Sequence, residues 1–266
     1  MLNKKESAIF GRKHYDMYTT NLTDSQWEGI SKLLDVKRKR KYSLRDIIDG
    51  ILYISKTGVQ WALLPKDFPP VGIVHYYFKT WGKTGVWQSI ILDFLKKYRE
   101  ITGKDPEPTA VIIDSQSIKN SERGVQDKGF DGHKKVKGRK RHVATDSNGR
   151  LITCVVGPAN EHDLQAGKRL IEKAIALNLP NIKIVVADGA YTSLVEWAKE
   201  EYGVDFQISM QIKEKKFIPV AHRWKVERFI SWMMWSRRLS RDYELNIESS
   251  QAWILVCGIT NLLRFF

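Results

Sequence analysis

Ala110-Val111-Ile112-Ile113-Asp114 and Ile184-Val185-Val186-Ala187-Asp188 are the two stretches that decide the fold, because each is a short apolar run that ends in an aspartate. Runs of this length and composition predict strands in the interior of a sheet. Where two neighbouring strands both end in a carboxylate, the charges meet at one edge of the sheet and repel each other until a divalent cation binds. Hard oxygen ligands of this kind suit Mg²⁺ or Mn²⁺.

A third acid, Glu227, lies on a helix that the sequence predicts over residues 222–240. Arg223 stands one turn before it, and Arg238 and Arg241 recur near the same angular position. Most of the opposite face is apolar, so one side is expected to pack on the sheet while the acid and its arginines face phosphate. Each acid alone has an ordinary explanation as a turn cap or an ion-pair partner. All three together, in a basic chain, favour a metal site.

Several other polar residues resemble site residues but have simpler explanations. Asp146 opens an Asn-Gly turn, and Asp131 stands in a glycine-flanked loop. The pair His162-Asp163 falls in the first turn of a predicted helix, where an acid favours the helix dipole. We therefore leave them out of the metal site and expect His133 and His142 to contact DNA or solvent.

The remaining elements after residue 105 predict a mixed sheet. Residues 141–146 and 150–156 flank Asn148-Gly149, which is a strong hairpin signal. A helix over residues 162–177, capped by Asn160, follows, and then come a strand to Asp188, a helix over 192–202 and a strand over 206–212. This order predicts an α/β domain in which helices cover a mixed sheet.

The first part of the chain reads as helical. We expect helices over 24–34 with Thr23 as N-cap, from Ser43 to Gly58, over 72–81 and over 86–99. Short helices with exposed cations resemble a helix-turn-helix DNA-binding module. The Pro- and Gly-containing stretch 102–108 is the best linker. It divides the chain into a helical DNA-binding domain, 1–104, and a catalytic domain, 105–266.

The composition points to a polyanionic partner. Among 266 residues, 44 are Lys or Arg and 30 are Asp or Glu, which gives a formal net charge of +14. Such a field attracts nucleic acid. The candidate DNA-binding residues are the cations of three basic runs: Lys37, Arg38, Lys39, Arg40, Lys41, Lys119, Lys134, Lys135, Lys137, Arg139, Lys140, Arg141, Arg223, Arg237, Arg238 and Arg241.

Other sequence features narrow the class of protein. No stretch has the ~18 or more consecutive apolar residues that a membrane-spanning helix needs. Residues 1–12 carry no export-signal pattern, so a cytoplasmic location is the default expectation. Cys154 and Cys257 lie among apolar residues with neither a zinc spacing nor a disulfide framework, and we expect both to be buried thiols.

Four segments together resemble the DDE transposases of bacterial insertion sequences, and more narrowly those of insertion-sequence families four and five. They are 113–119 (Ile-Asp-Ser-Gln-Ser-Ile-Lys), 137–142 (Lys-Gly-Arg-Lys-Arg-His), 187–191 (Ala-Asp-Gly-Ala-Tyr) and 223–228 (Arg-Trp-Lys-Val-Glu-Arg). Residues 22–81 also resemble the N-terminal module of that family, so the similarity covers nearly the whole chain.

The resemblance implies a ribonuclease H-like catalytic fold in which Asp114, Asp188 and Glu227 are catalytic and bind two Mg²⁺ ions, with Mn²⁺ as a substitute. It implies cleavage of double-stranded DNA at the terminal inverted repeats of an insertion sequence and joining to target DNA in the bacterial cytoplasm. We expect a homodimer, because two element ends must be held together. The family's Tyr, Arg, Glu, Lys signature is kept only at its Arg and Glu; Val220 and Met234 replace the others, and Arg237 or Arg238 is expected to supply the missing phosphate contact.

Three alternatives remain open from the sequence. The first is a DNA-binding regulator whose second domain is inactive. The second is a ribonuclease H-like nuclease that cuts but does not join. The third is a metal-dependent phosphohydrolase that acts on small phosphates, which the excess of positive charge disfavours.

Overall fold

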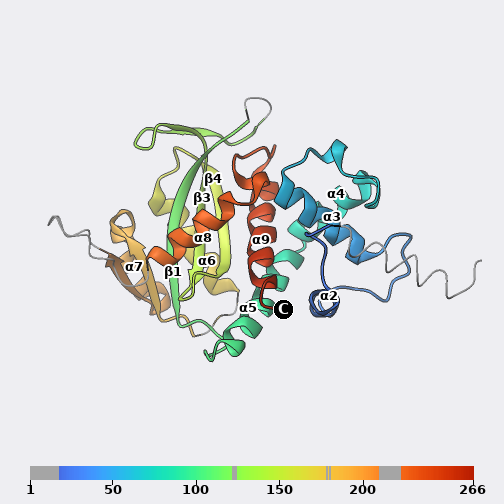
Figure 1. The fold of residues 1–266 in the computed structure, drawn as a ribbon. Coiled ribbons are helices and arrows are strands. Elements are labelled where there is room, and N and C mark those ends of the chain that lie inside the picture. Colours follow the sequence, from blue (N-terminus) through green and yellow to red (C-terminus); the bar gives the residue numbers. More distant parts are fainter. Residues whose placement is uncertain (1–17, 122–124, 178, 180, 210–222) are drawn as a thin grey trace, which may run out of the picture.

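The computed structural model describes residues 18–121, 125–177, 179, 181–209 and 223–266. The N-terminal helices lie on one side of the molecule and a mixed sheet lies on the other, with helix α9 (Ile247–Leu263) between them (Figure 1). The mixed α/β class with a helical N-terminal part is as the sequence predicts. Within the described residues, no helix is both long and apolar enough to cross a membrane.

The N-terminal part contains α2 (Asp24–Ser31), α3 (Leu44–Thr57), α4 (Val71–Lys83) and α5 (Val86–Ile101). The predicted start and stop signals are confirmed. Thr23 caps α2 in a reciprocal capping box with Gln26, Ser43 caps α3, and Gly58 ends α3 with φ of 69°, a left-handed conformation that glycine adopts without strain. Two of the connections are long, 32–43 and 58–70, and the second contains the short η1 (Trp61–Leu63). The tight turn in this part joins α4 to α5.

The sheet has the ribonuclease H-like arrangement. It is built from β1 (Ala110–Lys119), β2 (Gly129–Asp131), β3 (Val136–Asp146), β4 (Leu151–Pro158), β5 (Ile184–Asp188) and β6 (Asp205–Ser209). The order is β2-β3-β1-β5-β6, and β4 also pairs with β3. β1 is antiparallel to β3 and parallel to β5, and β5 is parallel to β6. The central strand β1 therefore lies beside β5, which ends in the second aspartate.

Helices cover both faces of the sheet. On one face α6 (Asp163–Ala176) packs against β3 and β4, and Val111 and Ile113 of β1 meet Leu170 and Ile171 of α6. On the other face α8 (Trp224–Met234) crosses β1 and β3, and α9 packs against β4 (Figure 1). Because side chains alternate along a strand, Asp114 points to the α8 face.

The hairpin between β3 and β4 forms at Asn148-Gly149 as predicted. The Oδ1 atom of Asp146 accepts hydrogen bonds from the backbone N–H groups of Asn148 and Arg150, each at 2.9 Å. Its Oδ2 atom lies 2.7 Å from Nη1 of Arg99 in α5. Asp146 is fully buried, so this ion pair compensates a charge that would otherwise be costly inside the protein.

The N-terminal helices and the sheet share one hydrophobic core. Helix α9 connects them, because it packs against α3, α4 and α5 as well as β4. The rings of Phe78 and Trp253 stack at 4.3 Å, and Nε2 of Gln26 donates to the carbonyl of Leu263 at 2.8 Å. Cys257 is buried in α9 and Cys154 in β4, both as free thiols, as predicted. The linker at 102–108 thus separates two stretches of sequence that pack on each other.

Several sequence-based boundaries are wrong. The first helix is predicted to run through Leu34, but α2 ends at Ser31. The helix that carries Glu227 ends at Met234, because Ser236 is extended and its hydroxyl donates to the carbonyl of Ser55 in α3 at 2.6 Å. The N-cap of α6 is His162, whose ring accepts from the N–H of Leu164, so Asn160 lies outside the helix. The predicted helix over 192–202 begins as a 3₁₀ segment, η2 (Gly189–Leu194), and becomes α-helical only in α7 (Val195–Tyr202). The strand predicted over 206–212 runs partly into residues outside the described ones.

Candidate active site

Asp114 and Asp188 lie at matching positions on adjacent parallel strands. The register pairs Ile112 with Val186, so the aspartates stand two residues further along each strand and on the same face. Each is held by a local backbone group. The Oδ1 atom of Asp114 accepts from the N–H of Ser115 at 2.7 Å, and Oδ1 of Asp188 accepts from the N–H of Ala190 at 3.1 Å, which caps η2.

Glu227 reaches the same region from α8, which packs across β1 and β3. It occupies the first turn of the helix, where a negative charge favours the helix dipole. Arg223 precedes it by one turn, and Nη2 of the arginine lies 2.8 Å from Oε1 of the glutamate. Arg223, the N-cap residue of α8, therefore lies beside the third acid.

The pKa of Asp114 shows that the three acids influence one another. Burial raises it from 3.8 to about 6, against the hydrogen bond from Ser115, which lowers it. The negative charges of Asp188 and Glu227 raise it further, while the positive charge of Arg223 lowers it. The structure therefore brings the three acids selected from the sequence into one electrostatic environment. A buried carboxyl with like charges around it is typical of a functional site.

Within the described part of the chain, no three His, Cys, Asp or Glu side chains are grouped so that they could hold a metal ion as they stand. Glu227 is turned to Arg223 and Asp188 to the backbone of η2. This is the arrangement expected of mutually repelling carboxylates, each of which pairs with the nearest donor.

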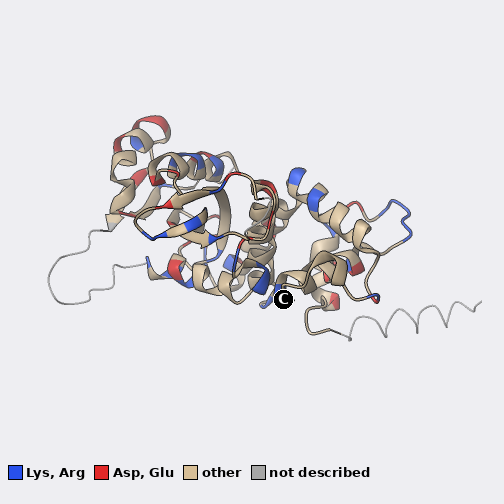
Figure 2. Ribbon diagram, turned by 90° about the horizontal axis from the view of Figure 1, so that it is seen from above, with Lys and Arg blue, Asp and Glu red and all other residues tan. Residues whose placement is uncertain are grey.

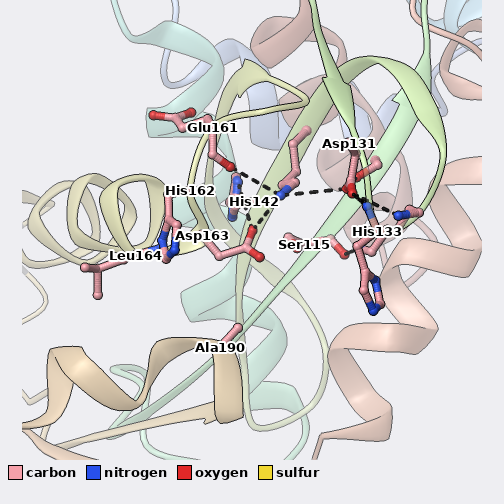
Figure 3. Close-up of polar contacts among 12 residues, drawn as sticks. Ser115, Asp131, His133, His142, Glu161, His162, Asp163, Leu164 and Ala190 are labelled. Atoms are coloured by element: carbon pink, nitrogen blue, oxygen red, sulfur yellow. Dashed lines mark hydrogen bonds and ion pairs between the residues drawn. The ribbon is translucent and has the colours of Figure 1, made fainter.

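A buried polar cluster on the α6 face was missed by the sequence reasoning. The Nζ atom of Lys140 lies 3.1 Å from Oδ1 of Asp163 and 3.8 Å from Oδ2 of Asp131. Figure 3 shows Asp131 and Asp163 approaching this contact from opposite sides. Asp131 also accepts from the hydroxyl of Ser117 in β1 at 2.6 Å. The cluster therefore ties β1, β3 and α6 together beneath the candidate site.

His142 belongs to this cluster, so the prediction that it contacts DNA or solvent is wrong. Its ring is fully buried, and burial lowers its pKa to about 3, so the imidazole is neutral. Its Nδ1 atom lies 3.2 Å from the hydroxyl of Tyr191, and that hydroxyl also hydrogen-bonds Ser115, the neighbour of Asp114. Tyr191 thus links the buried face to the backbone that holds Asp114. Strand alternation is the signal that could have found His142, because it shares a face with the buried Ala144.

Many of the predicted DNA-binding cations are on the surface. The loop between α2 and α3 carries Lys37, Arg38, Lys39 and Lys41 as exposed side chains, and it projects from one end of the molecule (Figure 2). Arg40 in the same loop is half-buried and pairs with Asp35 at 3.4 Å. The other exposed members of the predicted set are Lys119, Lys134, Lys135, Lys137, Arg237 and Arg241.

The remaining predicted cations, apart from the half-buried Arg223, are buried, and we correct their assignment. Arg139 is fully buried and donates to the carbonyls of residues 126, 244, 245 and 246, while Arg141 donates to the carbonyl of Leu239 at 2.7 Å. Arg238 pairs with Glu244, and Lys140 belongs to the buried cluster. Arg139 and Arg141 hold η3 (Arg237–Leu239) and the segment after it onto β3, and Arg238 holds that segment to η3. Lys140 holds helix α6 onto β3, so none of the four side chains has a surface for phosphate.

Comparison with known proteins identifies the family through two family models. Residues 22–91 match a family described as "Putative transposase of IS4/5 family", and residues 105–262 match the transposase DDE domain. One similar solved structure is described as "Crystal structure of the Mos1 Strand Transfer Complex"; the match has 12% identity and a TM-score of 0.28, and it covers 97% of this chain and 90% of that chain. No curated protein matches. Because the DDE model covers more than half of the sequence, the chain belongs to the DDE transposases, in the group of insertion sequences IS4/5.

Proposed function

We propose that this transposase cuts and joins DNA at a site formed by Asp114, Asp188 and Glu227. The observation that carries the proposal is the raised pKa of Asp114, to which the charges of both other acids contribute. The parallel register of β1 and β5, which sets Asp114 beside Asp188, and the packing of α8 across β1 support the same grouping. The chain has a net charge of +14, so a group of three acids without an equal number of cations is unusual in it.

The residues fit divalent cations, with Mg²⁺ as the expected ion and Mn²⁺ as a substitute. All three side chains offer hard oxygen donors, which these ions prefer. Their mutual repulsion is a cost that a bound cation would offset. When bound, a pair of such ions supplies an activated attacking oxygen and stabilisation of the leaving oxygen during displacement at phosphorus. Asp114 and Asp188 would hold them from fixed strands, and Glu227 from α8 after leaving Arg223.

The chain itself would position the DNA. Once Glu227 turns to the ions, the guanidinium of Arg223 becomes available to a phosphate, for which its planar fork is well suited. The exposed cations of the 37–41 loop would contact the phosphates of a duplex and fix its register. Tyr191 and His142 act as positioning residues, because they hold Ser115 and hence the strand on which Asp114 stands.

The proposed substrates are the terminal inverted repeats of an insertion sequence and a target duplex. We propose that two copies of the chain act together, since both element ends must be cut and joined, and that the reaction takes place in the bacterial cytoplasm. The residues support DNA more than a small phosphate compound, because the exposed cations extend over both the N-terminal part and the sheet.

The test is cleavage of labelled duplex DNA that carries the element's own ends, in buffer with MnCl₂ or MgCl₂. We expect Asp188→Asn and Glu227→Gln to bind this DNA with unchanged affinity and to leave it uncut. Lys199→Ala, an exposed change on α7, is the matched control and should cut normally. If Asp188→Asn cuts at the wild-type rate, the proposed site is wrong.

Joining is measured separately with a pre-cut end that bears a free 3′-hydroxyl. A transposase joins it to target DNA, whereas a nuclease without joining activity leaves it unchanged. A protein that binds the ends yet neither cuts nor joins them under any metal would instead be a DNA-binding regulator.

A further inference from the structure

A basic groove lies at the end of the sheet beyond Asp114. It has a volume of about 540 Å³ and is lined by the cations Lys119, Lys128, Lys135, Lys137 and Arg241 together with Phe130. No Asp or Glu lines it, and within the described residues none of the five cations forms an ion pair. Five uncompensated positive charges around one concavity make a strong attraction for phosphate.

Phe130 distinguishes this groove from an ordinary basic surface. It is the middle residue of the short strand β2, and 57% of its surface is exposed. A large aromatic side chain that is exposed to water among cations is unfavourable unless something covers it. It is the usual combination in proteins that bind single-stranded nucleic acid, where cations follow the backbone and aromatic rings stack on the bases.

Two further features of the groove wall are unusual. Lys135 has φ of 55°, a left-handed conformation that a non-glycine side chain adopts at a cost, and strain of this kind is found at functional sites. Asn120, also in the wall, has a buried side-chain amide whose N and O atoms find no hydrogen-bond partner in the described structure. Buried polar groups are nearly always satisfied, by water or ligand where protein does not reach.

Size and position decide what the groove holds. A cavity of this volume accommodates a small-molecule-sized group, which is one or two nucleotides and not a whole duplex. Lys119 follows Asp114 by five residues on β1, so the groove begins about 16 Å along the strand from the carboxylates. This is about five nucleotides of a strand with a B-form spacing of about 3.4 Å.

We propose that the groove binds a single strand of DNA about five nucleotides from the cleavage site, with one unpaired base stacked on Phe130 and the adjoining phosphates on the cations. The inference rests on the proposed function, since it assigns a place to a strand that leaves the duplex near Asp114 and Asp188. The sequence predicted only phosphate contacts for this surface. The inference adds a site that recognises unpaired bases.

The experiment measures binding of a short fluorescein-labelled oligothymidylate by anisotropy, for the full chain and for Phe130→Ala. We expect roughly 5- to 150-fold weaker binding in the variant, which is the effect of losing one base–aromatic stack. A labelled oligomer of abasic sugar-phosphate units should bind both proteins equally, because it offers phosphates and no base. Tyr202→Ala, which removes another exposed aromatic residue, is the matched control and should bind as wild type.

The salt dependence tests the cations. Lys137→Ala should reduce the slope of log affinity against log salt by about 0.7, the contribution of one phosphate contact on a single strand, whereas Phe130→Ala should leave that slope unchanged. The inference is overturned if Phe130→Ala binds oligothymidylate like the wild type, or weakens the abasic oligomer equally. Cleavage of duplex ends by the wild type is measured alongside. If the wild type does not cleave duplex ends, the proposed function is contradicted. If the wild type cleaves normally and Phe130→Ala binds oligothymidylate with wild-type affinity, only the role of the groove is contradicted.

Discussion

Arg223 and Glu227 stand one helical turn apart on α8, with Nη2 of the arginine 2.8 Å from Oε1 of the glutamate. The arginine thus engages the one acid of the three that comes from a helix. Because both side chains are partly exposed, the pair contributes little to stability. Its importance is that it places a positive charge where the carboxylates would bind a cation.

Arg223→Ala should strengthen the binding of Mn²⁺ and weaken cleavage. Without the guanidinium, the site is more negative and Glu227 has no competing partner, so the rise in Tm produced by MnCl₂ should exceed that of the wild type. Cleavage should fall, because the phosphate loses a donor. Thermal melts across a MnCl₂ titration measure the first effect, with Lys199→Ala as the control. Equal shifts in both proteins would contradict this role.

Asp114→Asn should stabilise the metal-free protein while abolishing cleavage. Burial and the charges of Asp188 and Glu227 disfavour the ionised carboxylate, so the neutral amide removes a cost of about 1–3 kcal/mol. Urea unfolding near pH 8 in the presence of EDTA measures the stability. A variant less stable than the wild type would show that the carboxylate is favourably compensated even without metal.

Asp49 should make stability depend on pH. Its Oδ1 atom accepts from the N–H of Leu22 at 2.8 Å, but burial raises its pKa to about 7, with Arg45 opposing and Asp46 adding to the rise. The unfolded pKa is about 3.9, so the folded state holds the proton more tightly. The associated stability is present below about pH 4 and is lost as the pH rises through about 7.

Melting curves of wild type and Asp49→Asn from about pH 5 to about pH 8 test this. The amide can still accept from Leu22, and its charge does not change. The Tm of the wild type should fall relative to that of the variant as the pH rises. Parallel curves would mean that Asp49 is ionised throughout this range.

Lys140→Met should be strongly destabilising. It leaves the carboxylates of Asp131 and Asp163 without their shared cation, and removal of one partner from a buried pair costs about 3–5 kcal/mol. The unfolding free energy in urea measures the loss. The triple variant Lys140→Met, Asp131→Asn, Asp163→Asn should recover much of it, because no unpaired charge remains. Failure of that recovery would assign the cost to packing of the lysine stem.

Lys135→Gly should separate stability from DNA binding. Glycine adopts φ of 55° without strain, so unfolding should become harder by up to about 1 kcal/mol. Binding of oligothymidylate should weaken, because one of the cations of the groove is lost. Lys135→Arg keeps the charge and the strain, and it should resemble the wild type in both measurements. A glycine variant that binds normally would remove Lys135 from the groove's function.

The carboxylate strands could be predicted from local sequence because their signals are local. An apolar run ending in Asp114 or Asp188 fixes a buried strand and a charge at its end, and parallel pairing then places the two side by side. Helix caps such as Thr23 and Ser43 are equally local. Glu227 is selected from the pattern of its own helix, an acid flanked by arginines opposite an apolar face, and the family resemblance then groups it with the two aspartates.

What sequence reasoning missed depends on packing between distant segments. The helix of Glu227 stops at Met234 because Ser236 bonds to Ser55, a contact between residues 181 positions apart. Arg139 and Arg141 look like phosphate ligands when cations are counted, but η3 and the segment after it bury them. Composition records that a residue is charged. Only the fold decides whether its partner is DNA or a carbonyl of the same chain.

The shared core around α9 has a mechanical consequence for the proposed function, in which the N-terminal helices bind DNA and the sheet carries the site that cuts it. Phe78 of α4 stacks on Trp253 of α9 within this core, so the distance and angle between the N-terminal helices and the sheet are expected to stay fixed. An extra base pair between the gripped sequence and the cut bond would turn that bond by about 35° around the duplex axis, away from the carboxylates. The spacing within the element's ends would then be dictated by the shape of the polypeptide.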